Sequence, residues 1–185
     1  ALQFAEDVAA RRDLDPTWVR ETLSQARFLP KVPALMLPPS RISAKNWRAY
    51  RSRFIEPIRI RAGVRFWQQH SAALARAERE YGVPAEIIVG ILGVETIFGQ
   101  NMGNFRVIDA LATLSFDFPS AHPRAMERRD FFRRELEQFL LMAQRHQIDP
   151  LEPLGSYAGA MGLPQFMPSS SASYAVDFDG DNHIN

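Results

Sequence analysis

The chain has 185 residues, 46% of them hydrophobic, and its 22 Lys and Arg nearly balance its 21 Asp and Glu, giving a net charge of +1. This length suits one domain with a substantial core, and the balanced charge argues against a general nucleic-acid binder or a polybasic membrane arm. Cysteine is absent, which excludes disulfides, thiolate catalysis and cysteine-ligated zinc. No transmembrane segment or signal peptide is recognisable, so we expect any export signal or lipid anchor to lie upstream.

Apolar residues recur with helical spacing through most of the chain. Asp15 and Pro16 predict the N-cap and first turn of a helix. A proline-rich, ordered connector is expected over residues 29–40. A long amphipathic helix is predicted around residues 66–81, with Gly82 at its end.

Pro84 predicts the start of a helix unlike the others. Its residues from Ile87 to Val94 are apolar on every side, so we expect this helix to be buried all round. A shorter helix is predicted over residues 107–114 and a long one over 126–145, whereas no convincing strand follows Pro153. The inward face of the long helix is predicted to carry four apolar residues: Phe132, Leu136, Phe139 and Leu140. The fold class is therefore mainly α.

Glu95 lies near the end of the apolar helix, with no Lys, Arg or His at helical spacing before it. Because an ionised carboxylate is costly to bury without a partner, a carboxyl there is expected to stay protonated. A protonated carboxyl is what the cleavage of a glycosidic bond requires of a general acid. Gly90, Gly93 and Gly99 leave room for a substrate or another backbone to come close. Taken alone, Glu95 more often indicates a carboxylate that reaches solvent or pairs with a distant arginine.

Longer motifs occur in a fixed order around this residue. The segment YGVPAEIIVGILGVET (81–96) closely resembles the signature of the membrane-bound lytic transglycosylase B family, and so do IDALATLSF (108–116), GSYAGAMG (155–162), QFMPSS (165–170) and YAVDF (174–178). The resemblance covers essentially the whole chain. It implies a lysozyme-like helical fold, with residues 1–80 as a helical part that packs on a core of residues 81–185 in one compact unit. It also implies that the family's core continues beyond Asn185.

The resemblance implies an enzyme that cleaves the bond between N-acetylmuramic acid and N-acetylglucosamine in peptidoglycan and forms 1,6-anhydromuramic acid. Glu95 matches the family's single general acid and base, and Ser156, Gln165 and Tyr50 match residues that bind the sugar. The residues alone also fit a loop serine, a glutamine that binds loop backbone and a core tyrosine.

Two other functions stay open: a hydrolytic muramidase, and a non-catalytic glycan-binding or scaffold fragment. The resemblance implies peptidoglycan strands and other cell-wall enzymes as partners. It places the parent protein in the periplasm, with an outer-membrane anchor as one option, and it requires no cofactor.

The chain departs from the family at two places. Leu163 and Pro164 stand where the family often has an aromatic residue and a glycine. The region 119–130 looks longer than in the family, so the substrate-facing arginine expected there cannot be assigned. Three arginines are candidates: Arg124, Arg128 and Arg129. Phe131 replaces an expected tyrosine.

The acidic end of the chain begins like an EF-hand loop, with carboxylates at the first, third and fifth positions in Asp177, Asp179 and Asp181. His183 would add its backbone carbonyl. A calcium site and a solvated acidic turn fit these residues about equally, because the chain ends before a bidentate acidic ligand.

Overall fold

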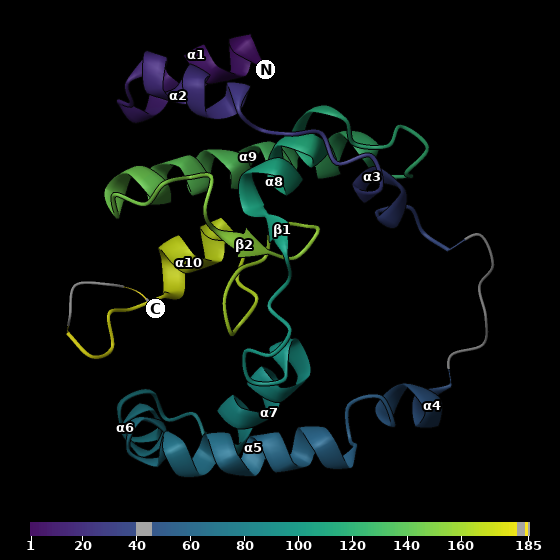
Figure 1. The fold of residues 1–185 in the computed structure, drawn as a ribbon, viewed down its shortest axis with the longest axis vertical. Coiled ribbons are helices and arrows are strands. Elements are labelled where there is room, and N and C mark those ends of the chain that lie inside the picture. The colour runs from purple at the N-terminus through teal and green to yellow at the C-terminus, as the bar shows by residue number, and fades with distance from the viewer. Residues whose placement is uncertain (40–45, 181–183, 185) are drawn as a thin grey trace. The chain divides into compact units, whose positions relative to one another are not determined.

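The structure is a computed structural model that describes residues 1–39, 46–180 and 184. In these residues the fold is mainly α, as predicted, and the paired strands are only two residues long (Figure 1). None of the described helices is long and apolar enough to cross a membrane. The elements in chain order are α1 (Leu2–Arg12), α2 (Pro16–Ser24), α3 (Val32–Leu35), α4 (Trp47–Arg51), α5 (Pro57–Gln69), α6 (Ser71–Tyr81), α7 (Ala85–Thr96), β1 (Phe105–Arg106), α8 (Val107–Phe116), α9 (Ala125–Arg145), β2 (Leu154–Gly155) and α10 (Pro168–Tyr174).

The chain forms two compact units. The first unit contains Ala1–Pro39, Gly103–Gly162 and Phe166–Asn185, and the second contains Ser40–Met102 and Leu163–Gln165. The sequence led us to expect one compact unit with a division after residue 80. That division falls inside the second unit, one residue before the end of α6, so a functional boundary there stays a prediction.

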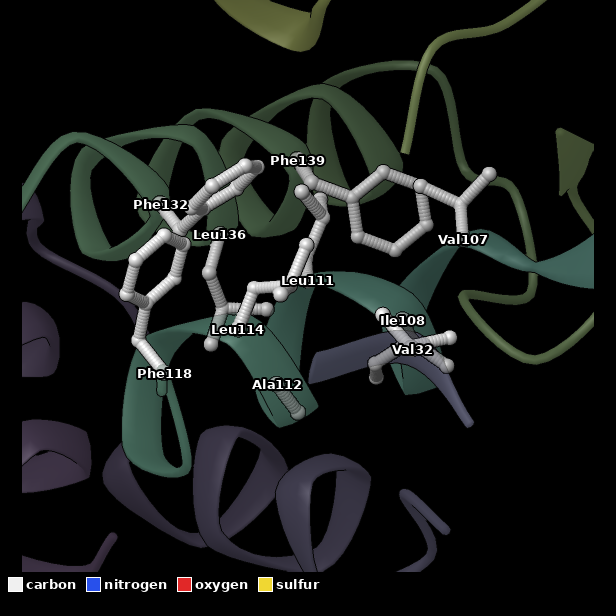
Figure 2. Packing of buried hydrophobic residues seen from close by; sticks show 10 residues of the cluster. All are labelled: Val32, Val107, Ile108, Leu111, Ala112, Leu114, Phe118, Phe132, Leu136 and Phe139. Carbon is white, nitrogen blue, oxygen red and sulfur yellow. The ribbon is translucent and has the colours of Figure 1, made fainter. Parts of the chain in front are cut away.

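The core of the first unit is built around α8, whose residues are buried from Val107 to Ser115. The four side chains of α9 that the sequence predicted to face inward are each no more than 1% exposed. Leu140 packs with residues of α1 and α2, and the other three pack against α8, as Figure 2 shows. Since burying one large apolar side chain is worth about 1.5–3 kcal/mol, this interface is the main source of stability in the unit.

Two buried polar side chains of α8 accept hydrogen bonds from the backbone of the connector that precedes α3. The carboxylate of Asp109 accepts hydrogen bonds from Arg27 N at 2.8 Å and from Arg106 Nη2 at 3.0 Å. Thr113 Oγ1 accepts a hydrogen bond from Leu29 N at 3.0 Å. These bonds satisfy backbone donors between α2 and α3 that no helix or strand pairs. The connector predicted over residues 29–40 contains the short helix α3, and its last residue lies outside the described ones.

In the second unit, the long helix predicted around residues 66–81 is two helices. His70 ends α5 and begins α6 with φ −111° and ψ 20°, so the chain turns at a residue that still donates to Phe66 O at 2.9 Å. Gly82 ends α6 in the left-handed conformation (φ 70°), and Asp15 caps α2 by accepting from Thr17 N at 2.8 Å, both as predicted. Asn46 caps α4 through Ala49 N at 3.0 Å.

The ion pairs of Glu137 join α9 to α1. Glu137 is 7% exposed, and its carboxylate accepts hydrogen bonds from Arg11 Nη2 at 2.7 Å and from Arg12 Nε. Burial raises the pKa of Glu137, but the hydrogen bonds from the two guanidinium groups outweigh burial and leave the pKa below its usual value. The pair therefore stabilises the fold above the unfolded-state pKa and loses this effect as the pH falls through the folded-state pKa.

We predict that Glu137→Gln lowers the free energy of unfolding by about 1–3 kcal/mol near neutral pH, because a nearly buried carboxylate that binds two half-exposed arginines is replaced by a neutral amide. The difference from the parent should shrink below about pH 4, where the parent carboxylate also becomes protonated. Denaturant unfolding at several pH values measures both effects, with Glu152→Gln as a control at an exposed glutamate. A difference that stays constant into the acid range would contradict the assignment.

Candidate functional site

One face of α7 lines a shallow groove of about 430 Å³. The helix packs on α5 and α6 through Ala85 and Val89, whereas Ile87, Ile91 and Val94 are 51%, 53% and 49% exposed. The prediction that α7 is buried all round is therefore wrong, because its neighbours cover only one face. Helix α8 is the one buried along nearly its whole length. The groove is lined by Glu86, Ile87, Gly90, Ile91, Val94 and Glu95.

Glu95 lies at the C-terminal end of this groove. Its side chain is exposed, so the burial that the sequence predicted is not observed. Within the described part of the chain, Glu95 makes no ion pair and no side-chain hydrogen bond. Its carboxyl is thus available to a ligand in the groove.

The chain leaves α7 through three successive residues with positive φ. Ile97, Phe98 and Gly99 have φ of 52°, 57° and 86°, and Asn101 N closes the turn by donating to Thr96 O at 2.8 Å. Glycine tolerates this conformation readily, but a β-branched residue such as Ile97 rarely adopts it. The backbone directly after Glu95 is therefore strained.

The ring of Phe98 lies between α5 and α7 at two glycines. A Cβ atom on Gly93 would be 2.9 Å from the Phe98 ring, and one on Gly63 would be 3.0 Å from it. The ring also contacts Phe66, with centroids 5.1 Å apart. Close approach by another part of the protein explains Gly93, whereas Gly90 has open space above it on the groove side.

Thr96 connects the end of α7 to the segment Leu163–Gln165. Its side chain is fully buried, and its hydroxyl donates to Leu163 O at 3.0 Å while accepting from Gly99 N at 3.0 Å. Gln165 Nε2 donates to Met102 O at 3.2 Å. The second unit thus holds both Glu95 and Gln165. Gln165 binds loop backbone, which was the alternative to a sugar contact, and its contact with sugar stays a prediction.

Ser156 belongs to the first unit, where it organises the loop after β2. Its Oγ accepts from Ala158 N at 3.2 Å and from Ala160 N at 3.1 Å. The hydroxyl oxygen is therefore a loop cap, as the plain interpretation of this serine predicted. The hydroxyl hydrogen can still be donated, so a substrate contact stays a prediction.

Tyr50 is not a core residue, because it is 53% exposed on α4. Its ring stacks with that of Trp47, which is 70% exposed, at 5.8 Å between centroids, and it contacts Phe54 at 5.0 Å. Arg59 lies over Phe54 at 5.2 Å. An ordered, exposed pair of aromatic rings is a surface on which a sugar face can pack. Its use by substrate is untested.

The three candidate arginines differ in their partners. Arg124 forms an ion pair with Glu127, whose hydrogen bond lowers the pKa of that carboxyl. Arg128 lies over the rings of Phe131 and Phe132, at 5.3 Å and 5.4 Å from their centroids. The Nε of Arg129 is buried without a hydrogen-bond partner among the described residues. Arg128 is therefore the candidate that contacts aromatic rings in place of a carboxylate.

The acidic end is only partly described. Asp177 Oδ1 accepts from Gly180 N at 2.7 Å and closes a turn there. Asp181 and His183 lie outside the described residues, and the described ones contain no group of three His, Asp or Glu able to hold a metal. The calcium site stays a prediction.

Sequence reasoning missed Thr96 and Phe98. A buried threonine immediately after Glu95 was visible in the sequence, but its partner Leu163 is 67 residues away. Phe98, whose ring leaves no room for a side chain at position 93, follows the helix by two residues. Helical spacing does not indicate that the backbone reverses there and brings the ring back to the helix.

Comparisons with known proteins identify relatives of this chain. The family model described as "Transglycosylase SLT domain" matches residues 1–185. Membrane-bound lytic murein transglycosylase B from Escherichia coli (strain K12) is 49% identical over 194 residues, which cover all of this chain and 52% of that protein. The chain thus spans about half the length of this curated relative.

Solved structures are similar as well. The E. coli lytic transglycosylase Slt35 in complex with calcium is 50% identical, with a TM-score of 0.88 over 99% of this chain and 56% of that one. SltB3 from Pseudomonas aeruginosa in complex with NAG-NAM-pentapeptide is 29% identical, with a TM-score of 0.82 over 97% of this chain and 45% of that one.

The two glycines of α7 give a matched pair of variants. We predict that Gly90→Ala raises the free energy of unfolding by about 0.5–1 kcal/mol, because alanine favours a helix and nothing obstructs its Cβ. Gly93→Ala should lower it by about 1–3 kcal/mol, because the Cβ would overlap the Phe98 ring. Chemical denaturation compares the two, and equal shifts would mean that Phe98 moves aside without cost.

Proposed function

The chain belongs to the transglycosylase SLT domain family, and from this we propose that it carries the catalytic core of a peptidoglycan lytic transglycosylase. In this proposal the protein cleaves the bond between N-acetylmuramic acid and N-acetylglucosamine and leaves a 1,6-anhydromuramic acid end. Glu95 is the single general acid and base.

The observation that carries the proposal is the unpaired carboxyl of Glu95 in the groove on α7. Glu86 is the second carboxylate of that groove, but it lies nine residues earlier on the same helix. At about 1.5 Å per residue the two are about 13 Å apart along the axis, and both side chains lean toward the helix N-terminus. Glycosidases that use two carboxylates hold them about 5–9.5 Å apart. Within the groove, Glu95 therefore acts without Glu86.

The proposed reaction needs only one carboxyl group. Glu95 donates its proton to the glycosidic oxygen as the bond from the anomeric carbon to that oxygen breaks, and the N-acetylglucosamine leaves as an alcohol. The acetamido group of the muramic acid stabilises the anomeric centre. The Glu95 carboxylate then takes the proton of the 6-hydroxyl while that oxygen bonds to the anomeric carbon. Water is not consumed, and the enzyme recovers its proton.

Three further side chains are proposed to bind the glycan. Ser156 has a hydroxyl hydrogen to donate, and Tyr50 with Trp47 presents an exposed aromatic surface. Gln165 lies on the segment that Thr96 joins to the end of α7. A relative at 29% identity was solved with NAG-NAM-pentapeptide, which supports glycan bearing peptides as the substrate class.

The setting of the protein follows from the same premise. We infer that it works on the cell wall in the periplasm, alongside other cell-wall enzymes, with anchoring to the outer membrane as one option. The reaction requires no cofactor. We also propose calcium as a ligand of Asp177, Asp179, Asp181 and His183, because a relative at 50% identity was solved in complex with calcium.

Two alternatives have distinct outcomes. In a hydrolytic muramidase, water intercepts the anomeric centre and leaves a reducing end. A glycan-binding or scaffold fragment would bind strands without cleaving them. The exposed and unpaired Glu95 favours an enzyme, because a scaffold has no use for a carboxyl at the end of an apolar groove.

We predict that Glu95→Gln retains the fold and glycan binding but loses strand cleavage by at least about 10²–10⁴-fold, because one group acts as both acid and base. Release of muropeptides from purified peptidoglycan measures the rate. Glu78→Gln, at an exposed glutamate of α6, is the control. Loss in Glu86→Gln with retention in Glu95→Gln would assign the acid to the other carboxylate of the groove.

The product gives an independent prediction. Strand ends released by the protein should be 1,6-anhydromuramic acid, lighter by one water than reducing ends. Mass spectrometry of the digest separates the two. A digest dominated by reducing ends would replace the transglycosylase with the muramidase.

A further inference from the structure

The turn after α7 holds strain that the local sequence does not explain. Ile97 and Phe98 both lie in the left-handed region, at φ 52° and 57°. Each such residue costs about 1–3 kcal/mol and persists only where its surroundings determine it strongly. A helix could end at Gly99 alone, which adopts positive φ without this cost. Two contacts of the second unit compensate for the strain.

The first contact is the Phe98 ring. It occupies a socket whose floor is Gly63 of α5 and Gly93 of α7, where Cβ atoms would lie 3.0 Å and 2.9 Å from it. The ring reaches this socket only if the backbone reverses immediately after the helix. Apolar burial of Phe98 is thus coupled to the left-handed turn.

The second contact is the Thr96 hydroxyl, which has no exposed surface. It accepts from Gly99 N within the turn and donates to Leu163 O, on the segment leading to Gln165. The hydroxyl has one hydrogen, and Leu163 O at 3.0 Å is closer to it than the other acceptor in reach, Leu92 O at 3.4 Å. Removing the hydroxyl would leave a partly buried amide and a partly buried carbonyl without this partner.

We propose that Thr96 and Phe98 are positioning residues that set the place of the Glu95 carboxyl relative to the Gln165 segment. The inference rests on the proposed function of Glu95. Glu95 is the residue directly before Thr96, so the turn determines the direction in which α7 presents its last side chains. A displacement of about 1 Å at a catalytic group can cost about 100-fold in rate.

A role in folding alone predicts a different result. In that case, variants at Thr96 would lower stability, and the folded fraction would keep its turnover. Positioning instead lowers kcat much more than it raises KM, because the acid is misplaced in the transition state while Gln165 is only one of the proposed glycan contacts.

Thr96→Val tests this, since valine keeps the shape and removes the hydroxyl. We expect kcat on soluble peptidoglycan oligomers to fall about 10–100-fold with KM within about two-fold. Thr96→Ser should restore most of the rate. Thr113→Val is the matched control, because Thr113 is also a buried threonine whose hydroxyl accepts a backbone amide, but in α8. It should lower the melting temperature and leave kcat unchanged.

The outcomes separate the two proposals. Equal kcat in Thr96→Val and Thr113→Val, with an inactive Glu95→Gln, would overturn the positioning role and leave the proposed function intact. An active Glu95→Gln would overturn the proposed function itself. If Thr96→Val does not fold, Phe98→Leu provides the test, because leucine is apolar but fills the socket of the Phe98 ring poorly. An unchanged kcat in Phe98→Leu would again overturn the positioning role.

Discussion

A hydroxyl with no exposed surface joins the parts of the candidate site that lie in the second unit. Thr96 bonds the end of α7 to Leu163, 67 residues later in the chain. Together with the bond from Gln165 Nε2 to Met102 O, the Thr96 bond holds the segment Leu163–Gln165 at the end of the helix that carries Glu95. The bond is possible because α7 ends in a left-handed turn, and the turn is stable because Phe98 fills a socket floored by two glycines. The strained turn, the buried Thr96 hydroxyl and the two glycines beside Phe98 therefore depend on one another.

In the first unit, too, buried polar side chains hold segments that have no regular secondary structure. Helix α8 is apolar enough to form the centre of the core, yet Asp109 and Thr113 stay within it because each satisfies backbone donors of the connector before α3. Glu135, 2% exposed on α9, accepts from Ser169 N and Oγ at the start of α10. Buried polar groups are costly unless they are paired, so each of them fixes a segment that has no regular partner.

Much of this fold was predictable because helix boundaries depend on local chemistry. An aspartate before a proline and a glycine after an amphipathic segment are typical helix caps, as Asp15 and Gly82 are here. The inward residues of α9 follow from helical spacing. The division at His70 and the exposed face of α7 were missed, because an apolar sequence does not tell which neighbours are present to cover it. Glu95 became a candidate through its place in an apolar helix, and Ser156, Gln165 and Tyr50 through the resemblance. The proposed roles of Thr96 and Phe98 depend on contacts across the chain. Periodicity contains no information on such contacts.

The exposure of Glu95 bears on how one carboxyl could serve as an acid. The groove beside it is lined mostly by apolar side chains, among them Ile87, Ile91 and Val94. On the proposed function, a chain of sugars bound there would cover these apolar side chains and exclude water from the groove. The substrate would thus cover the face of the helix that the sequence predicted to be buried. Glycan binding and cleavage then use one surface, since a strand that covers the groove also reaches the carboxyl at its end.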